Sequence, residues 1–275
     1  MNKPDALDYD GRYRDIISDP INVFINRVPE AGIVYKDHVY LHNGIRVPFS
    51  GNLAYYEDFS KILIYNRGVH EPLEEFIFQE LIKRLPQNPV MIELGAYWGH
   101  YSMWMKKERP NANIHLVEAD SNNIEVGKNN LKNQNMDATF ILQPVGVNGF
   151  IVDKYINNFD KVNLLHSDIQ GYEIEMLEGA TESLNKFKID YLMISTHSED
   201  LHKLVLKKLK KHKYRIEVSS GFNETLSHDG FILASSPNVN KIVRNWKPIE
   251  RLDLLNMTQE KIVKFIIETK KVFKL

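Results

Sequence analysis

The chain has 275 residues, of which 43% are hydrophobic and 26% are charged, a composition typical of a globular protein with one large domain or two small ones. Its 35 basic and 36 acidic side chains give a formal net charge of −1, which argues against a nucleic-acid substrate because proteins that bind nucleic acids usually carry a basic surplus. The absence of cysteine excludes disulfides, thiolate zinc sites and cysteine nucleophiles.

Residues 1–70 are interpreted as an N-terminal accessory region that contains one strong hairpin signal. Asn43 and Gly44 lie between two apolar stretches, and this dipeptide favours the tight turn of a β-hairpin. A helix is predicted to begin at Pro72, because proline suits the first helical position and apolar residues follow at helical spacing as far as Leu85. Pro86 ends this helix.

From residue 90 the pattern changes to alternating strands and helices. Short apolar runs predict seven strands, at residues 90–92, 114–117, 139–142, 162–165, 191–194, 214–218 and 231–234. Helical patterns lie between them, with Ser121 and Ser198 as caps and one long helical face from Leu177 to Phe187. The alternation predicts an α/β domain over residues 71–237, with a doubly wound, mainly parallel seven-stranded sheet and helices on both faces.

Residues 238–275 are expected to form a C-terminal helical extension. Thr258 can cap an amphipathic helix in which Ile262, Phe265, Ile266 and Thr269 share a face. We expect this face to dock on the domain or on a second subunit, so a homo-oligomer is one of the alternatives. Binding to a membrane surface is the alternative, since several lysines make the helix basic.

A glycine turn follows the first strand of the α/β domain. Residues 93–102 read ELGAYWGHYS, in which Gly95 allows a tight turn close to a ligand and Gly99 allows close helix packing. The helix start offers N–H groups to a ligand carboxylate, and Glu93 can accept a hydrogen bond from a ligand ammonium. The turn therefore suits the amino-acid end of S-adenosylmethionine, and a purely structural turn is the alternative.

The second strand ends in VEAD, residues 117–120. Nucleoside-binding folds of this type place an acid here, roughly 20 residues after the glycine turn, to hold the ribose hydroxyls. We assign that role to Glu118, and Asp120 to the start of the next helix. A nicotinamide dinucleotide is the competing cofactor, but Tyr97 occupies the second glycine position of its fingerprint, where the bulky ring would obstruct a diphosphate.

The fourth and fifth strands end in polar residues that can carry chemistry. Asp168 follows the fourth strand and can act as a general base, as a metal ligand or as the cap of the next helix. His197 follows the fifth strand and can accept a hydroxyl proton or ligate a divalent metal beside Asp168. A histidine that only bonds its own turn is the alternative for His197.

Together these residues resemble the FkbM-type methyltransferases, which belong to the Rossmann-like S-adenosylmethionine enzymes. The resemblance covers about residues 68 to 235 and is carried by Glu71-Pro72, the glycine turn, VEAD, DIQGYE at 168–173 and LEGA at 177–180. It implies that Asp168 lies between the sulfonium and the substrate. The cofactor contacts expected from the motifs and the resemblance are Glu93, Gly95, Tyr97, Gly99, Ser102, Glu118, Ala119 and Asp168.

The sequence departs from the pattern of the family in three ways, which involve four residues. Tyr97 replaces the usual asparagine, Gln170 replaces the usual glutamate, and His166 and His197 add imidazoles beside Asp168. In catechol-type O-methyltransferases the metal ligands come from the ends of the corresponding fourth and fifth strands. By that analogy Asp168 and His197 hold magnesium or another divalent ion.

The function expected from the sequence is S-adenosylmethionine-dependent methyl transfer, with Asp168 or His197 as the base. Because many members of the family serve surface-polysaccharide biosynthesis, we expect O-methylation of a sugar or another small polar metabolite. An NAD-dependent oxidoreductase and a non-catalytic glycan-binding protein on the same fold are the alternatives. No apolar run approaches the roughly 20 residues that span a bilayer, and no signal-like core opens the chain, so we expect a cytoplasmic protein without a membrane span.

Overall fold

The computed structural model describes residues 3–56 and 59–275. Residues 84–216 and 232–240 form one compact unit, called the α/β unit below, and the other described residues form a second unit, called the terminal unit because it holds both ends of the chain. The division into an accessory region (residues 1–70), an α/β domain (71–237) and a C-terminal helical extension (238–275) stays a prediction.

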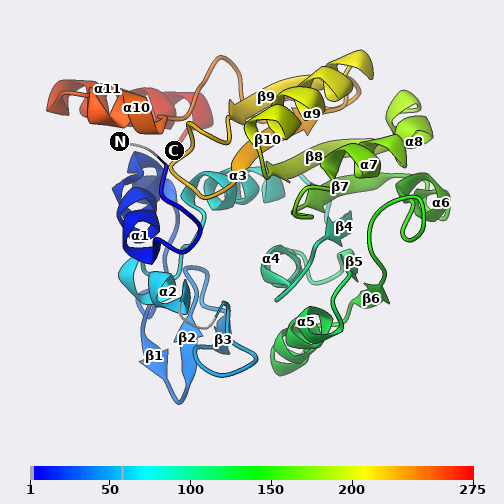
Figure 1. The fold of residues 1–275 in the computed structure, drawn as a ribbon, viewed down its shortest axis with the longest axis horizontal. Coiled ribbons are helices and arrows are strands. Elements are labelled where there is room, and N and C mark those ends of the chain that lie inside the picture. Colours follow the sequence, from blue (N-terminus) through cyan, green and yellow to red (C-terminus); the bar gives the residue numbers. More distant parts are fainter. Residues whose placement is uncertain (1–2, 57–58) are drawn as a thin grey trace. The chain divides into compact units, whose positions relative to one another are not determined.

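The fold is built on a seven-stranded sheet, as predicted (Figure 1). Strand β4 is parallel to both β5 and β7, and the pairs β5–β6 and β7–β8 are also parallel. The order along the sheet is β6-β5-β4-β7-β8-β10-β9. The strands are β4 (Val90–Leu94), β5 (Asn113–Glu118), β6 (Thr139–Leu142), β7 (Val162–Ser167), β8 (Ile189–Thr196), β9 (Arg215–Ser220) and β10 (Gly230–Ser235).

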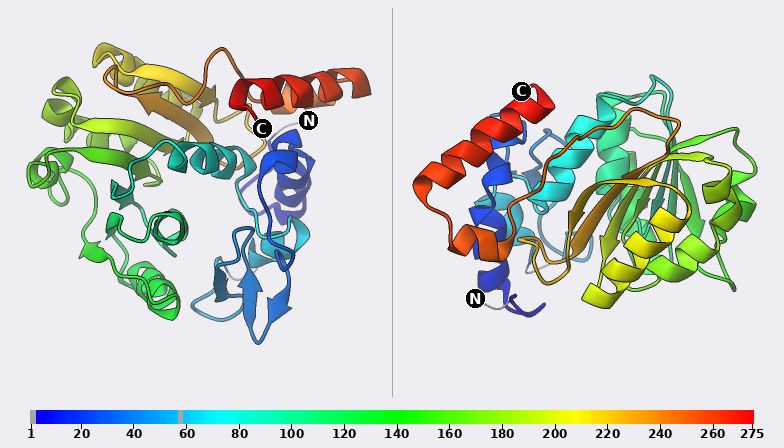
Figure 2. Two further views of the ribbon diagram at one scale, coloured as in Figure 1. Left: turned by 180° about the vertical axis from the view of Figure 1, so that it is seen from behind. Right: turned by 90° about the horizontal axis from the view of Figure 1, so that it is seen from above.

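Helices of the α/β unit cover its strands (Figures 1 and 2). Every residue of β8 is buried, the pattern of a strand that is covered on both faces. Along β4, Ile92 and Leu94 enter the main apolar core of the unit together with Leu177 and Val205, so alternate side chains of the strand point to this face. The helices are α4 (His100–Glu108), α5 (Ser121–Asn133), α6 (Val152–Ile156), α7 (Glu173–Glu178), α8 (Thr181–Asn185) and α9 (Glu199–Lys211).

Two helix starts differ from prediction. Asp120 caps α5 by accepting the N–H groups of Asn122 and Asn123, so Ser121 is the first helical residue and not the cap. The long helix predicted as far as Phe187 is divided into α7 and α8, because Asp153 accepts the N–H groups of Glu182 and Ser183 and thereby starts a new helix. Ser198 caps α9 as expected.

The terminal unit contains a small antiparallel sheet and short helices. Asn43 and Gly44 lie in the turn between β2 and β3, so the predicted hairpin is confirmed. A second hairpin joins β1 to β2 through Lys36 and Asp37, both with positive φ. The elements are β1 (Val34–Tyr35), β2 (His38–Tyr40), β3 (Arg46–Pro48), α1 (Tyr9–Ser18), the 3-10 helices η1 (Pro20–Phe24) and η2 (Phe59–Lys61), α2 (Ile62–Tyr65), α3 (Pro72–Ile82), α10 (Arg251–Leu255) and α11 (Gln259–Phe273).

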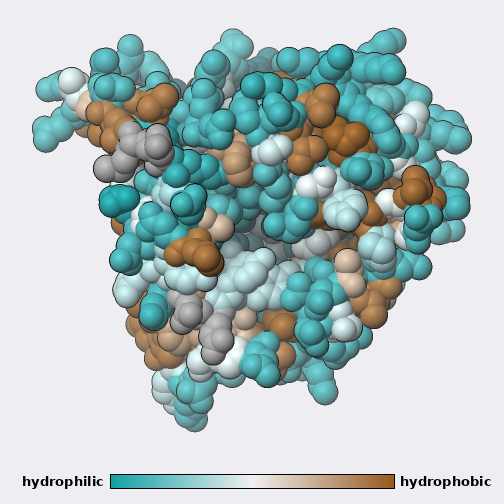
Figure 3. Space-filling model, in the orientation of Figure 1, coloured by the Kyte–Doolittle hydropathy of each residue, from teal (hydrophilic) through white to brown (hydrophobic). Residues whose placement is uncertain are grey.

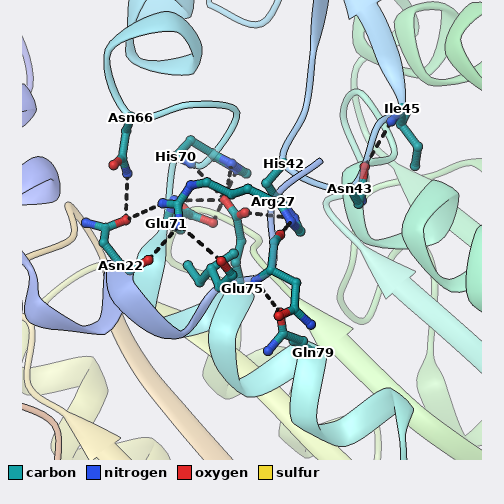
Figure 4. A network of polar contacts seen from close by, with 12 residues as sticks. Asn22, Arg27, His42, Asn43, Ile45, Asn66, His70, Glu71, Glu75 and Gln79 are labelled. Atoms are coloured by element: carbon teal, nitrogen blue, oxygen red, sulfur yellow. Dashed lines mark hydrogen bonds and ion pairs between the residues drawn. The ribbon is translucent and has the colours of Figure 1, made fainter. Parts of the chain in front are cut away.

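A buried carboxylate organises the polar interior of the terminal unit (Figure 4). Glu75, in the first turn of α3, accepts hydrogen bonds from the backbone N–H groups of His70 and Glu71 at 2.8 and 3.1 Å. The imidazoles of His70 and His42 lie 2.7 and 3.2 Å from its two oxygens. Burial lowers the pKa of His42 against the opposing charge of Glu75. Glu75 therefore joins the hairpin segment and the chain before α3 to this helix.

The C-terminal helix docks within the terminal unit through the face that contains Phe265 and Thr269, as predicted. Trp246 donates a hydrogen bond from Nε1 to the Thr269 hydroxyl at 2.9 Å. The Phe273 ring lies with its centroid 4.7 Å from that of Phe76 and 5.2 Å from that of Trp246. None of the helices within residues 3–56 and 59–275 has the length and apolar character that crossing a membrane requires.

Candidate functional site

The predicted site residues of the α/β unit gather where the direction of the sheet order changes. From β4 the chain adds β5 and β6 on one side and then β7 and β8 on the other. Ligands of such sheets bind outside the carboxyl ends of the strands at this switch point. Glu93, Glu118, Asp168 and His197 all lie at the carboxyl ends of β4, β5, β7 and β8 or directly after them.

Gly95 brings three of these strand ends together. Its φ of +72° lies in the left-handed region, and a Cβ atom at this position would lie 1.7 Å from the carbonyl oxygen of Asp168. The Asp168 N–H donates to the Leu94 carbonyl, and the Gly95 N–H donates to that of Val117, both at 2.9 Å. Only glycine allows this approach, so the glycine is required by the protein's own backbone.

The rest of the turn is equally tight. Gly99 has a φ of +72°, and a Cβ atom there would lie 2.9 Å from Leu131 and 3.2 Å from Leu116, which confirms its predicted role in close packing. Tyr97 also has a positive φ, of 41°, and its N–H donates to Glu118 Oε2 at 3.0 Å. The glycine turn and the acid at the end of β5 are therefore in direct contact.

Glu93 is buried and bonded to the helix that follows it. Its carboxylate accepts the Ser102 N–H at 3.0 Å and also the Ser102 hydroxyl. Burial raises the pKa of Glu93, against the opposing effects of His166 and Ser102. The N–H of Ser102 in the first turn of α4 therefore already has an acceptor, and a ligand carboxylate would have to use other N–H groups of this helix start.

Glu118 accepts hydrogen bonds with both of its oxygens. Oε1 accepts the N–H groups of Ala119 and Asp120 at 2.8 and 2.9 Å, and Oε2 accepts that of Tyr97. A carboxylate offers about four lone-pair positions. Oε2 therefore has capacity for one further donor, as a ribose hydroxyl would supply.

Asp168, His197 and Glu173 form a chain of contacts. His197 Nε2 lies 3.0 Å from Asp168 Oδ1, and its Nδ1 lies 2.6 Å from Glu173 Oε1. The side chain of Asp168 is 32% exposed, that of His197 is 12% exposed, and that of Glu173 is fully buried. The exposed end of this chain is thus a carboxylate, and the imidazole lies behind it.

Two of the alternative interpretations disagree with this geometry. The N-terminal cap position of α7 is Tyr172, so Asp168 does not cap the next helix. The ring nitrogens of His197 face the carboxylates of Asp168 and Glu173, so its contacts extend well beyond its own turn.

The charge of Asp168 follows from these neighbours. Partial burial acts to raise its pKa, but the hydrogen bond and charge of His197, the charge of His166 and the amide of Gln170 together lower it below the ordinary value. Gln170 Nε2 donates to Asp168 Oδ1 at 3.0 Å. Asp168 is therefore an ionised hydrogen-bond acceptor at neutral pH.

The family model of the methyltransferase FkbM domain matches residues 66–216, more than half of the chain. This chain belongs to the FkbM methyltransferase family. It is therefore an S-adenosylmethionine-dependent methyltransferase, as the resemblance implied. None of the curated proteins compared with the chain matches it.

Several solved methyltransferases are similar to this FkbM-family chain at low identity. A precorrin-6y C5,15-methyltransferase from Geobacter metallireducens is 14% identical with a TM-score of 0.45, covering 60% of this chain and 87% of that chain. TrmK from M. capricolum, in complex with S-adenosyl-homocysteine, is 10% identical with a TM-score of 0.43, covering 71% and 83%. A SAM-dependent methyltransferase from Aquifex aeolicus is 12% identical with a TM-score of 0.41, covering 59% and 90%.

The departures from the FkbM pattern have local explanations. Asparagine, the usual residue at position 97, tolerates left-handed backbone better than tyrosine does, so Tyr97 holds the same turn at some cost in strain. Gln170 donates a hydrogen bond to Asp168, whereas the usual glutamate would place a second negative charge beside it. The substitution therefore favours an ionised Asp168.

Sequence reasoning missed Glu173 as a site residue. It belongs to the DIQGYE motif that carried the resemblance, but its partner His197 lies 24 residues away. The available signal was an acid in the first turn of a helix, directly after a strand end that bears Asp168. Its contact with the end of β8 requires the parallel pairing of β7 with β8.

We predict that Gly95→Ala lowers the free energy of unfolding by more than about 3 kcal/mol, because the added methyl group meets the Asp168 carbonyl. Urea unfolding followed by circular dichroism measures the loss. Gly51→Ala is the matched control, since Gly51 has a similar φ of +80° with nothing within 4 Å of the added methyl group. Equal losses in the two variants would contradict a specific steric role for Gly95.

Proposed function

We propose that this FkbM-family methyltransferase O-methylates a hydroxyl of a sugar or another small polar metabolite, with Asp168 as the group that accepts the hydroxyl proton. The observation that carries the proposal is the partly exposed, ionised Asp168 carboxylate at the switch point of the sheet. A sugar acceptor and a place in polysaccharide biosynthesis in the cytoplasm are supported by the resemblance of the sequence motifs to family members with such roles.

The residues at the carboxyl ends of β4 and β5 fit the cofactor. When bound, S-adenosylmethionine supplies a methyl group that its sulfonium makes electrophilic. Glu118, with spare acceptor capacity on Oε2, would hold a ribose hydroxyl, and the turn formed by Gly95, Tyr97 and Gly99 would receive the amino-acid end. Glu93 and Ser102, which are hydrogen-bonded to each other, would hold this turn in place. Ala119 would border the ribose beside Glu118.

The proton balance of the proposed reaction is simple. With the cofactor bound, its methyl group would pass to the acceptor oxygen, and the electron pair of the former carbon–sulfur bond would remain on sulfur. The hydroxyl proton passes to Asp168. A carboxylate of lowered pKa can accept it because the hydroxyl becomes strongly acidic as the new bond forms. The neighbouring imidazole of His197 would hold the carboxylate in place.

Asp168 is a better candidate for the base than His197. Both ring nitrogens of His197 face carboxylate oxygens, and its side chain is less exposed than that of Asp168. An imidazole in this position can orient Asp168 and hold positive charge beside it. We therefore assign His197 as a positioning residue, with Glu173 fixing its ring through Nδ1.

A divalent metal at Asp168 and His197 is the second candidate arrangement. Nδ1 of His197 faces the buried Glu173 carboxylate, the arrangement that orients metal-ligating histidines and leaves Nε2 to face the ion. Nε2 then lies 3.0 Å from Asp168 Oδ1, a separation that two ligands of one ion can have. These two residues would hold magnesium or a similar ion, which would polarise the acceptor hydroxyl.

We predict that Glu118→Gln weakens binding of S-adenosylhomocysteine at least about tenfold, because an amide cannot accept at both positions and lacks the charge. Isothermal titration calorimetry measures the affinity, with the unchanged protein binding S-adenosylhomocysteine and not NAD. Glu125→Gln on the exposed surface of α5 is the control. Unchanged binding in Glu118→Gln would place the ribose elsewhere.

We predict that Asp168→Asn lowers turnover at least about a hundredfold while S-adenosylhomocysteine binds within a few-fold of normal, because the amide keeps the shape but cannot take a proton. Formation of S-adenosylhomocysteine is measured with nucleotide sugars and glycans as acceptors. Asp160→Asn, on the exposed surface, serves as control. Normal turnover in Asp168→Asn would remove this residue from the mechanism.

The metal arrangement is tested separately with a chelator. If an ion lies between Asp168 and His197, treatment with EDTA abolishes turnover, and added Mg²⁺ restores it. Isothermal titration calorimetry with Mg²⁺ alone then shows binding to the unchanged protein and no binding to the His197→Gln variant. Full activity after chelation and dialysis would exclude the metal arrangement. The mechanism in which Asp168 accepts the proton without a metal would then stand alone.

A further inference from the structure

The outer face of helix α11 (Gln259–Phe273) carries an apolar strip flanked by charges. The inner face is occupied, since Phe265, Thr269 and Phe273 are buried in the terminal unit. On the outer face Val263 and Ile267 are 54% and 47% exposed. The space-filling view shows apolar side chains among polar ones over the region of α10 and α11 (Figure 3). A shallow groove on this face is lined by Gln259, Glu260, Val263, Lys264, Ile267, Glu268 and Lys271.

The charges of this face alternate along the helix. Glu260, Lys264, Glu268 and Lys271 succeed one another at spacings of three or four residues, which places them on one side of an α-helix. Read from the other end, the order becomes Lys271, Glu268, Lys264, Glu260, with the opposite sign at each step. The face is therefore complementary to itself in antiparallel orientation.

We propose that α11 is the interface of a dimer in which the outer faces of two copies of this helix pack antiparallel across a two-fold axis near residues 265 and 266. That axis places Val263 opposite Ile267 of the second copy on one flank. On the other flank Lys264 lies opposite Glu268 of the second copy, and Glu260 lies opposite Lys271. The symmetry forms every pair twice, as an isologous interface requires.

Other occupants suit this face less well. A parallel pair of helices would set Glu260 against Glu260 and Lys264 against Lys264, and like charges at such positions repel. A membrane surface with anionic lipids favours a uniformly basic face, whereas two of the four charged residues here are acidic. A second copy of the chain matches both the apolar strip and the alternating charges.

The size of the face sets the strength of association. A helix of 15 residues is roughly 22 Å long, so one helix pair buries less than the approximately 800 Å² per partner of a standard interface. The dimer is therefore expected to form in the micromolar range and to weaken with salt, because its ion pairs are at the surface.

Sedimentation velocity of the full chain, between about 1 and 300 µM, tests this interface, since small interfaces associate in that range. Lys271→Glu should weaken dimerisation at least about tenfold, because it faces Glu260 of the second copy with like charge. The double variant Glu260→Lys with Lys271→Glu should restore it to within a few-fold. Lys207→Glu on the exposed surface of α9 makes the same change of net charge and should have no effect.

A second variant addresses the apolar strip. Ile267→Asp should abolish dimerisation while the helical circular dichroism signal stays unchanged, because this side chain is exposed in one copy. A protein that stays monomeric over the whole range overturns the proposal, as does a dimer that Lys271→Glu leaves intact. Cosedimentation of the monomer with phosphatidylserine vesicles would assign the face to a lipid surface and also overturn it.

Discussion

The approach of Gly95 to the carbonyl of Asp168 is the constraint on which the site depends. It holds the end of β4 against the backbone that follows β7, and the Gly95 N–H fixes the end of β5 through Val117. The glycine turn and the proposed base are thereby placed by one backbone contact. The geometry of the protein itself thus requires the absence of a side chain at Gly95, and the proposed approach of a ligand would require it too.

Three carboxylates around this contact have different environments, and the different roles proposed for them rest on these environments. Glu93 is buried, its pKa is raised, and its hydrogen bonds go to Ser102 in the first turn of α4. Glu118 accepts three backbone N–H groups and keeps one position for a donor. Asp168 is partly exposed, with a pKa lowered by the imidazoles and the amide around it. The sequence shows three acids at strand ends, and only their surroundings distinguish the roles proposed for them, which are support of the turn, ribose binding and proton acceptance.

The sequence predicted what depends on local periodicity and missed what depends on contacts between distant segments. Seven buried apolar runs were enough to place the strands, and Asp168 and His197 followed because parallel strands end at one edge. The break between α7 and α8 depends on Asp153, and the orientation of His197 depends on Glu173, through contacts of 24 to 30 residues in sequence separation. The terminal unit was harder still, because Arg251 pairs with Asp15 across 236 residues, which no local pattern encodes.

The inner face of α11 is explained by packing within one chain, whereas its outer face is explained only in part. Phe265, Thr269 and Phe273 are explained by the terminal unit, which they fill and to which Trp246 bonds. The alternating charges of the outer face are explained in part within one chain, since Lys264 lies 3.7 Å from Glu268. Such pairs do not account for Val263 and Ile267, whose partial exposure to water carries a cost in a single copy. An occupant that covers both residues while preserving the charge pairs removes that cost, and an antiparallel second copy does so with the residues already in place.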